Sequence, residues 1–212
     1  MKVIKPGTTA LYPVPAVLVS CGPSTSTPEA LRLRASSGNV GRPNIITLAW
    51  VGTLCSDPPA VGIGVRPERF SHDLIEEVGE FVVNLPRADQ VSVVDYCGQV
   101  SGREVDKWAA CGLTPLPASK VRPPLIAECP VALECRVIHR LALGAHDLYV
   151  GEVLAIQVDE AMLTAQGHID YEKIQPLAYV GGYYWRVGEL LGRHGDWRQG
   201  GVKNPPNRSR GK

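Results

Sequence analysis

The sequence has almost no net charge and no long apolar run. Its 212 residues carry 22 Lys+Arg against 21 Asp+Glu, a formal net charge of +1. A dedicated nucleic-acid-binding domain is usually strongly basic, and an acidic disordered chain carries a large net charge, so both classes are disfavoured. No apolar run reaches the roughly 18 residues that indicate a membrane-spanning helix. We therefore expect neither a nucleic-acid partner nor a membrane partner.

The short motifs of several enzyme classes are also missing. There is no Gly-x-Ser-x-Gly, no P-loop, no His-Glu-x-x-His, and no Gly-x-Gly-x-x-Gly at the start of a helix. Gly62 and Gly64 fall inside an expected strand, which is the wrong context for a dinucleotide fingerprint. Hydrolase, nucleoside triphosphatase, metalloprotease and Rossmann interpretations therefore lack their parts.

The six cysteines form no Cys-x-x-Cys pair, and none has a histidine at zinc-ligand spacing. Such scatter is a weak disulfide framework and a poor metal site. We expect no metal, and mostly buried, reduced thiols in a cytoplasmic protein. Whether any thiol is redox-active stays open, with Cys55 and Cys97 as candidates by neighbourhood alone.

The start of the chain has a basic end and a short apolar segment. Residues 18–21 resemble a lipoprotein cleavage box, but Pro6, Pro13 and Pro15 interrupt the segment before it. A helical signal sequence tolerates such prolines poorly, whereas a strand tolerates them at its entry. We therefore interpret residues 1–12 as an N-terminal arm and residues 13–21 as a first strand.

Glycine and proline are frequent, at 22 and 18 residues, which indicates many short elements joined by turns. The strands do not alternate regularly with helices, so a doubly wound parallel sheet is disfavoured. We predict a mainly β fold, a split antiparallel β-barrel with short peripheral helices over residues 13–190, followed by a basic flexible tail over 191–212. The expected strands cover 13–21, 44–54, 60–65, 80–84, 131–143, 148–158 and 177–184, and the expected helices cover 71–79, 89–98 and 103–112.

Punctuation residues support the expected helices. Ser71 or Asp73 can cap the helix at 71–79, and Gly79 fits its C-terminal end. Gly98 and Gly112 fit the ends of the other two helices in the same way.

Positively charged and hydroxyl side chains gather just before the helix at 71–79. Arg66, Arg69, Ser71 and His72 stand where the free N–H groups of a helix start favour an anion. The segment therefore fits a phosphate site, and it equally fits a capped surface helix beside ordinary arginines. Lys107 and His146, taken singly, also fit a solvated helix face and a hairpin turn.

Several short motifs follow one another along the chain. They are Asn44-x-x-Thr47-x-x-Trp50, Pro58-Pro59, Val61-Gly-Ile-Gly-Val65, Ser71-x-x-Leu-Ile75, Glu80-Phe-Val-Val-Asn84, Ser101-Gly-Arg-Glu-Val-Asp-Lys107-Trp108, His146-x-x-x-x-Gly-Glu-Val153 and Tyr179-Val-Gly-Gly-Tyr-Tyr184. In this order they resemble the flavin reductase-like, FMN-binding split-barrel family, with the flavoredoxins as the most similar branch. The resemblance extends over about residues 13–185.

This resemblance implies the residues that line a flavin. The family positions are occupied here by Asn44, Trp50, Ser71, Lys107, His146 and Tyr179. Ser71 replaces a threonine and Tyr179 replaces a phenylalanine, and these changes keep the hydroxyl and the aromatic ring.

From the resemblance and the chemistry of FMN together, we expect His146, Asn44 and Trp50 at the reacting face. The phosphate needs N–H groups and cations, and the ring needs a dry slot with donors at its edge. The expected cofactor-binding set is Asn44, Ile45, Thr47, Trp50, Ser56, Arg66, Ser71, His72, Asn84, Lys107, His146 and Tyr179.

The resemblance further implies a homodimer with one FMN per subunit and reduction by NADH or NADPH. The expected function is an NAD(P)H-dependent reductase of flavin or ferric-type acceptors. The alternative is a flavoredoxin-type electron carrier that receives electrons from a protein donor. A flavin-binding barrel without turnover, or a split barrel holding haem or a pyridoxine phosphate, also stays open.

Overall fold

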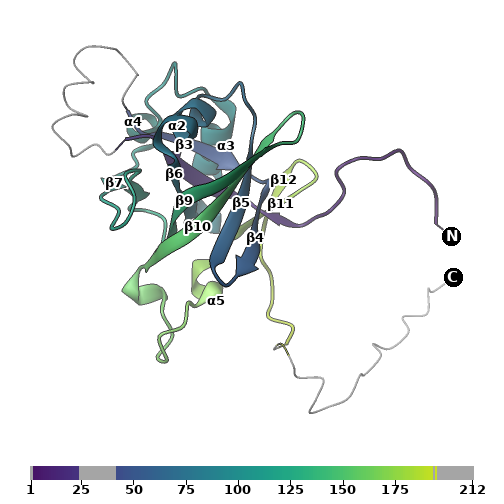
Figure 1. Ribbon diagram of the computed structural model, residues 1–212. Helices are drawn as coiled ribbons and strands as arrows, with labels where there is room; N and C mark the ends of the chain where they lie inside the picture. The colour runs from purple at the N-terminus through teal and green to yellow at the C-terminus, as the bar shows by residue number, and fades with distance from the viewer. Residues whose placement is uncertain (1, 24–41, 193, 195–212) are drawn as a thin grey trace, which may run out of the picture.

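A curled antiparallel sheet of seven strands forms the body of the protein (Figure 1). The computed structural model describes residues 2–23, 42–192 and 194. The order across the sheet is β3-β2-β6-β9-β10-β5-β4. The strands are β2 (Val17–Cys21), β3 (Asn44–Leu48), β4 (Val51–Ser56), β5 (Pro59–Val65), β6 (Glu80–Leu85), β9 (Val131–Ala142) and β10 (Asp147–Val158).

The two edge strands of this sheet are neighbours in the sequence. Only Ala49 and Trp50 separate β3 from β4, so the sheet must curl until its edges approach one another. The approach is seen in the contact of β3 with β5, the strand that pairs with β4. Because β3 and β4 do not pair, the barrel stays split, and the prediction of a mainly β, antiparallel split barrel is confirmed.

Short elements cover the sheet. Two small sheets are formed by β1 (Val14–Pro15), β11 (Leu177–Val180) and β12 (Tyr183–Arg186), and by β7 (Pro115–Leu116) and β8 (Leu125–Ile126). The helices are α2 (Phe70–Val78), α3 (Val91–Gln99), α4 (Lys107–Cys111) and α5 (Tyr171–Ile174), with 3₁₀ turns at Ala88–Gln90 and Glu160–Met162. No helix in the described part of the chain is long and apolar enough to cross a membrane.

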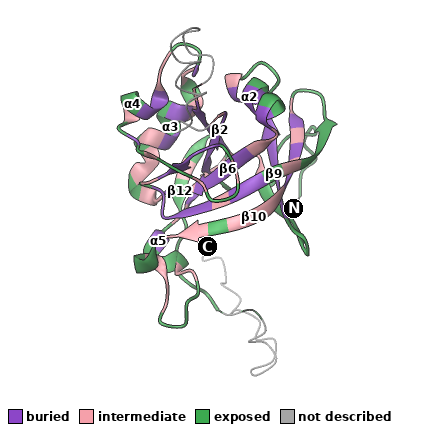
Figure 2. Ribbon diagram, turned by 60° about the vertical axis from the view of Figure 1, so that its left-hand side comes forward, coloured by how far each residue is buried: buried purple, intermediate pink, exposed green. Residues whose placement is uncertain are grey.

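The core lies on both faces of β2 and β3. Val17, Val19 and Ile46 point into the cluster that α2 closes, while Leu18 and Ile45 point to the cluster under α3 and α4. Alternate residues of a strand face opposite sides, so burial on two faces requires an unbroken apolar run, as 17–19 and 45–46 provide. Figure 2 shows this burial in β2, in β6 and in the first part of β9.

The long hairpin is confirmed, since β9 and β10 pair antiparallel along their whole length, with register shifts at Val150–Gly151 and Val153–Ala155. The segment at 44–54 is interrupted at Ala49–Trp50, where the chain passes from one sheet edge to the other. The last strand is a hairpin rather than one strand, because Gly181 and Gly182 adopt positive φ and turn the chain. Residues 18–21 lie in the buried β2, as expected of a strand.

The helix ends are confirmed in two of three cases. Gly79 and Gly112 close α2 and α4 with φ of 68° and 63°, in the left-handed region that glycine favours. Gly98 does not end a helix. It lies inside α3, where a Cβ would stand 3.3 Å from the Thr47 Cβ, so it permits close packing on β3.

The helix starts differ from the prediction. Capping by Ser71 or Asp73 is wrong, because α2 begins at Phe70 and Arg69 is its N-cap residue without a side-chain hydrogen bond. The helix expected at 103–112 begins only at Lys107. Asp106 is its N-cap residue, and the Asp106 carboxylate accepts hydrogen bonds from the N–H groups of Trp108 and Ala109.

The arm at residues 2–12 contains no strand and is mostly exposed. The domain limits at 12 and 190 stay predictions. Of the expected tail at 191–212, residues 193 and 195–212 lie outside the described residues.

Asn84 occupies the centre of the sheet and not a ligand-accessible surface. Its fully buried amide donates to the Leu18 carbonyl and the Ser20 hydroxyl at 3.1 Å each, and accepts from the Ile126 N–H at 3.0 Å. The amide therefore fastens β6 to β2 and to β8. A buried amide with these partners is committed to the fold.

We expect Asn84→Ala to lower the free energy of unfolding by about 2–3 kcal/mol, because it leaves buried groups without hydrogen bonds. Urea unfolding followed by circular dichroism measures the loss, with Thr53→Ala in exposed β4 as the control. A loss below about 0.5 kcal/mol, within the range of ordinary surface substitutions, would contradict the role.

Candidate functional site

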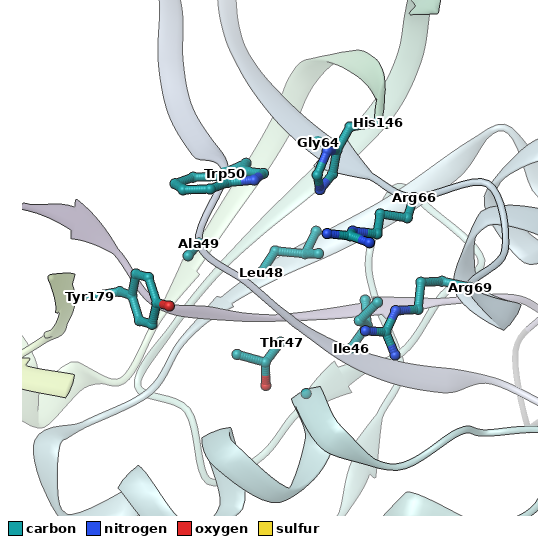
Figure 3. A pocket seen from close by; sticks show the side chains of 11 residues that line it. Ile46, Thr47, Leu48, Ala49, Trp50, Gly64, Arg66, Arg69, His146 and Tyr179 are labelled. Carbon is teal, nitrogen blue, oxygen red and sulfur yellow. The ribbon is translucent and has the colours of Figure 1, made fainter. Parts of the chain in front are cut away.

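A cleft opens at the split of the barrel, beside the edge strand β3. Its wider part is a cavity of about 270 Å³ between β3, the Ala49–Trp50 link and the ends of β5 and β10 (Figure 3). Its lining consists of Ile46, Thr47, Leu48, Ala49, Trp50, Gly64, Arg66, Arg69, Gly98, His146 and Tyr179.

A second cavity of about 160 Å³ continues the first toward α2 and α4. The two share Ile46, Arg69 and Gly98, so they form one elongated cleft. The far end of this cleft is polar and includes Asn44, Ser71 and Lys107.

The backbone of β3 provides a hydrogen-bonding edge along the cleft. The Ile45 carbonyl accepts from Lys107, so it points away from β2, the strand with which β3 pairs at this edge of the sheet. The N–H and C=O of one residue in an antiparallel strand point the same way, and the direction repeats every second residue. The backbone N–H and C=O of Thr47 therefore also face the open edge. The Thr47 side chain is already engaged, since its hydroxyl donates to the Val94 carbonyl.

Lys107 is a buried cation at the polar end. It is only 3 % exposed, and its ammonium donates to the carbonyls of Ile45 and Cys97 at 2.7 Å each. Burial lowers its pKa from the usual value. Two neutral carbonyls do not balance a positive charge, and no carboxylate forms an ion pair with this ammonium among the described residues. An ammonium has three donors, so one hydrogen remains for a group in the cleft.

Asn44 and Ser71 form the wall beside this ammonium. The Asn44 amide donates to the Ser71 hydroxyl at 2.9 Å, and both residues are buried. Gly102 passes so close that a Cβ there would stand 2.1 Å from the Asn44 Oδ1. Only glycine permits this approach, which holds the Asn44 amide in place.

Aromatic rings line the wide end of the cleft. Tyr12 lies between Trp50 and Tyr179, with ring centroids at 6.5 and 6.2 Å. Trp50 also meets His146 edge-on at 6.5 Å. Figure 3 shows Trp50, His146 and Tyr179 around the opening. Such rings favour a flat apolar ligand surface.

The residue that follows His146, Asp147, is anchored by two side chains. The Asp147 carboxylate is 2 % exposed and meets His72 Nε2 at 2.7 Å and Arg140 Nη2 at 2.6 Å. These two partners hold the pKa of Asp147 below its usual value. Because Asp147 begins β10, the network fixes the strand end from which His146 reaches the cleft.

Partial burial, and then the nearby Arg66 charge, lower the pKa of His146 from its usual value of 6.5. At neutral pH the imidazole is therefore neutral, with one nitrogen as donor and the other as acceptor.

The two arginines at the cleft differ in their surroundings. Arg66 is half exposed and its guanidinium lies 3.5 Å from the Glu68 carboxylate. Arg69 lines both cavities. A cation at the junction of the cavities suits a ligand that extends through both of them and carries an anionic group.

The structure brings together most of the predicted site. Asn44, Thr47, Trp50, Arg66, Ser71, Lys107, His146 and Tyr179 all line the cleft. Ile45 buries its side chain and contributes its carbonyl to Lys107.

Three predicted residues lie elsewhere, for physical reasons. Ser56 is exposed at the far end of β4, the end away from Trp50. His72 lies on the buried side of α2 and meets Asp147. Asn84 hydrogen-bonds to the backbone of the neighbouring strand β2. None of the three lines the cleft.

The sequence pattern missed Tyr12, Gly98 and Gly102. Tyr12 lies in the arm, and nothing in the local sequence indicates that it meets Trp50. The two glycines resemble ordinary turn residues until the close approach to Thr47 and Asn44 is seen. In the described part of the chain, no group of three or more His, Cys, Asp or Glu is arranged to hold a metal.

An elongated cleft with a cationic end, a backbone edge and aromatic walls suits a ligand that joins an anionic group to a flat polar ring. Comparisons with known proteins point the same way. Residues 33–188 match the flavin reductase like domain family.

Solved structures of similar proteins cover nearly the whole chain. The flavoredoxin of Desulfovibrio vulgaris (Miyazaki F) has 33% identity and a TM-score of 0.79, covering 92% of this chain and 97% of that one. The flavoredoxin from Methanosarcina acetivorans has 31% identity and a TM-score of 0.78, covering 92% and 96%. An FMN-binding protein from Thermus thermophilus has 26% identity and a TM-score of 0.70, covering 91% and 97%.

We expect Asp147→Asn to lower the melting temperature at pH 7, and the difference from the wild type to narrow on acidification. The native pKa of Asp147 lies below the usual 3.8, so the unfolded state takes up the proton first. The carboxylate's stabilisation is therefore present above pH 3.8 and is lost as the pH falls through the lower native pKa.

Thermal unfolding of both proteins between pH 7 and pH 3 measures this effect, with Asp159→Asn at an exposed carboxylate as the control. A difference that is constant across this range would show that the Asp147 network does not stabilise the fold through its charge.

Proposed function

The chain belongs to the flavin reductase-like family, and from that premise we propose that it binds FMN in the cleft and reacts with NADH or NADPH. The observation that carries this proposal is the buried Lys107 ammonium, which has no carboxylate partner among the residues that the structure describes. A phosphate group at the polar end balances that charge.

The residues of the polar end fit a phosphate. Lys107 supplies a charge-assisted donor, Arg69 a guanidinium, and Ser71 a hydroxyl. The cavity there is small, about 160 Å³, which matches a single compact anion rather than a second ring.

The residues of the wide end fit the flavin ring system. The Thr47 backbone faces the open edge of β3 and offers one donor and one acceptor. Gly64 lets Trp50 pack closely against β5 at the wall of the cleft, because a Cβ there would stand 3.1 Å from the Trp50 Cβ. Trp50 and Tyr179 close the sides.

When bound, FMN would supply two-electron hydride chemistry and one-electron transfer. The protein's part is to position the reactants and exclude water. Trp50 and Tyr179 keep the wide end dry, and the neutral His146 imidazole can exchange a proton with a group at the opening. Hydride transfer needs positioning more than an acid–base pair, in accordance with the absence of an obvious pair in the cleft.

An apolar cavity of about 440 Å³ adjoins the cleft and shares Trp50, Gly64 and His146 with it. Its other walls include Leu54 and Leu143, which are 53 % and 66 % exposed. Exposed apolar walls of this size favour association. We therefore propose a homodimer in which a second copy covers these walls.

The electron donor distinguishes the proposed function from its alternative. In the first, the protein is an NAD(P)H-dependent reductase of flavin or ferric-type acceptors. The second, favoured by the similarity to two flavoredoxins, is an electron carrier that takes electrons from a protein donor. Rapid NADH or NADPH oxidation supports the reductase. Tight FMN retention with negligible oxidation supports the carrier.

We expect Lys107→Met to weaken FMN binding by about 10- to 100-fold, the worth of a charge-assisted hydrogen bond to phosphate. Riboflavin has the ring and lacks the phosphate, so its affinity should change little. Fluorescence titration of both ligands measures the two affinities, and retained riboflavin binding shows that the variant is folded.

Lys120→Met, at an exposed position, is the matched control. Equal losses of FMN and riboflavin affinity in Lys107→Met would show that Lys107 does not bind the phosphate.

We expect His146→Ala to slow the reaction with NADH or NADPH by about tenfold while FMN stays bound, because His146 borders the wide end and not the phosphate end. Anaerobic stopped-flow absorbance measures the rate, and His168→Ala at an exposed histidine is the control. An unchanged rate in His146→Ala would refute the assigned role.

A further inference from the structure

Helices α3 and α4 bring two thiols into contact beside the cleft. The sulfur atoms of Cys97 and Cys111 lie 3.9 Å apart, and both residues are free thiols. They are 14 residues apart in the sequence, and the spacing follows no redox motif. Cys97 also lines the polar end of the cleft.

We propose that Cys97 and Cys111 form a reversible disulfide that ties α4 to α3 and thereby fixes Lys107 at the polar end of the cleft. The formation of the bond stands on the sulfur geometry alone. Its effect on a bound phosphate rests on the function proposed above.

The geometry requires little movement. A disulfide has a sulfur–sulfur distance of about 2.05 Å, so the sulfurs must approach by about 2 Å, which rotation of side chains and a slight shift of a short helix can provide. Helix α4 has only five residues, and short helices derive their stability from packing rather than from their own hydrogen bonds.

The two thiols differ in how far they are exposed to an oxidant in solution. Cys97 is fully buried, and burial raises its pKa to about 12. Cys111 is half-buried, so an oxidant reaches it first. Cys97 then acts as the resolving thiol, already adjacent to the sulfur that it must attack.

The oxidant is a low-molecular-weight disulfide. The Cys111 thiolate attacks one of its sulfurs, which forms a mixed disulfide and releases one thiol. The Cys97 sulfur then attacks the Cys111 sulfur, forms the internal bond and releases the second thiol. The two cysteine protons end on the two released thiols, so one disulfide is reduced as the other forms.

The bond would act on Lys107 through a short path. Lys107 and Cys111 are four residues apart and lie on the same face of α4. The Lys107 ammonium already donates to the Cys97 carbonyl at 2.7 Å. The disulfide adds a covalent tie between the same two helices, so Lys107 leaves the cleft less often.

The test begins with the full-length protein, incubated with excess glutathione disulfide, alkylated and digested with trypsin. Cleavage at Arg87, Arg103, Lys107 and Lys120 separates Cys97 in peptide 88–103 from Cys111 in peptide 108–120. We expect a linked pair of these peptides, lighter by two hydrogen atoms than their sum, which disappears on treatment with dithiothreitol.

Cys111→Ser should abolish the linked pair, whereas Cys55→Ser, at an exposed thiol, should leave it unchanged. Glutathione bound to Cys111 without a linked pair would overturn the proposal, as would an unmodified Cys111 in a sample whose Cys55 has reacted.

The second readout is the rate of FMN dissociation. We expect it to be about threefold or more slower in the oxidised wild type than in the reduced wild type, and equal under both conditions in Cys111→Ser. An equal rate in oxidised and reduced wild type would overturn the effect on Lys107. A protein that forms the linked pair and binds no FMN would refute the proposed function and leave the disulfide established.

Discussion

The structure depends on one buried charge, the Lys107 ammonium. It lies between the edge strand β3 and helix α3, and its two hydrogen bonds to Ile45 and Cys97 join these elements at the polar end of the cleft. Taking an ammonium out of water is costly unless its donors and its charge are satisfied. The two carbonyls accept two of the three N–H groups, but they carry no negative charge to balance the ammonium. This end of the cleft is therefore suited to an anion.

The second constraint is the open edge of the sheet. The strand order places β3 and β4 at opposite edges, and a two-residue link brings these edges together without pairing them. An unpaired strand edge offers donors and acceptors that a folded protein has to cover. Here α3 and α4 cover part of the β3 edge and a flat ligand suits the remainder. The same split thus creates the cavity and supplies its hydrogen-bonding wall.

The sequence predicted the frame better than the site. The hairpin at 131–158 follows from the alternation of apolar and polar residues, and the ends of α2 and α4 follow from the preference of glycine for positive φ. Both signals can be read from the local sequence. Asn44 and Lys107 were found through the order of motifs in the resemblance, whereas Ser71 also stood out in the local cluster before the expected helix at 71–79. His72 and Asn84 were wrongly predicted to bind the cofactor. The sequence shows that a residue is polar, but it does not show whether its hydrogen-bond partner is a ligand or another part of the protein. Only the partners Asp147, Leu18, Ser20 and Ile126 distinguish the two cases. Tyr12 was missed because its contact with Trp50 joins distant parts of the chain.

In the proposed function, Lys107 decides where the phosphate lies. A crystal structure of the protein with bound FMN tests this most directly. We expect a phosphate oxygen within about 3 Å of the Lys107 Nζ, with the ring between Thr47 and Trp50. A phosphate outside the polar end, with the Lys107 ammonium still bonded only to the Ile45 and Cys97 carbonyls, would contradict it.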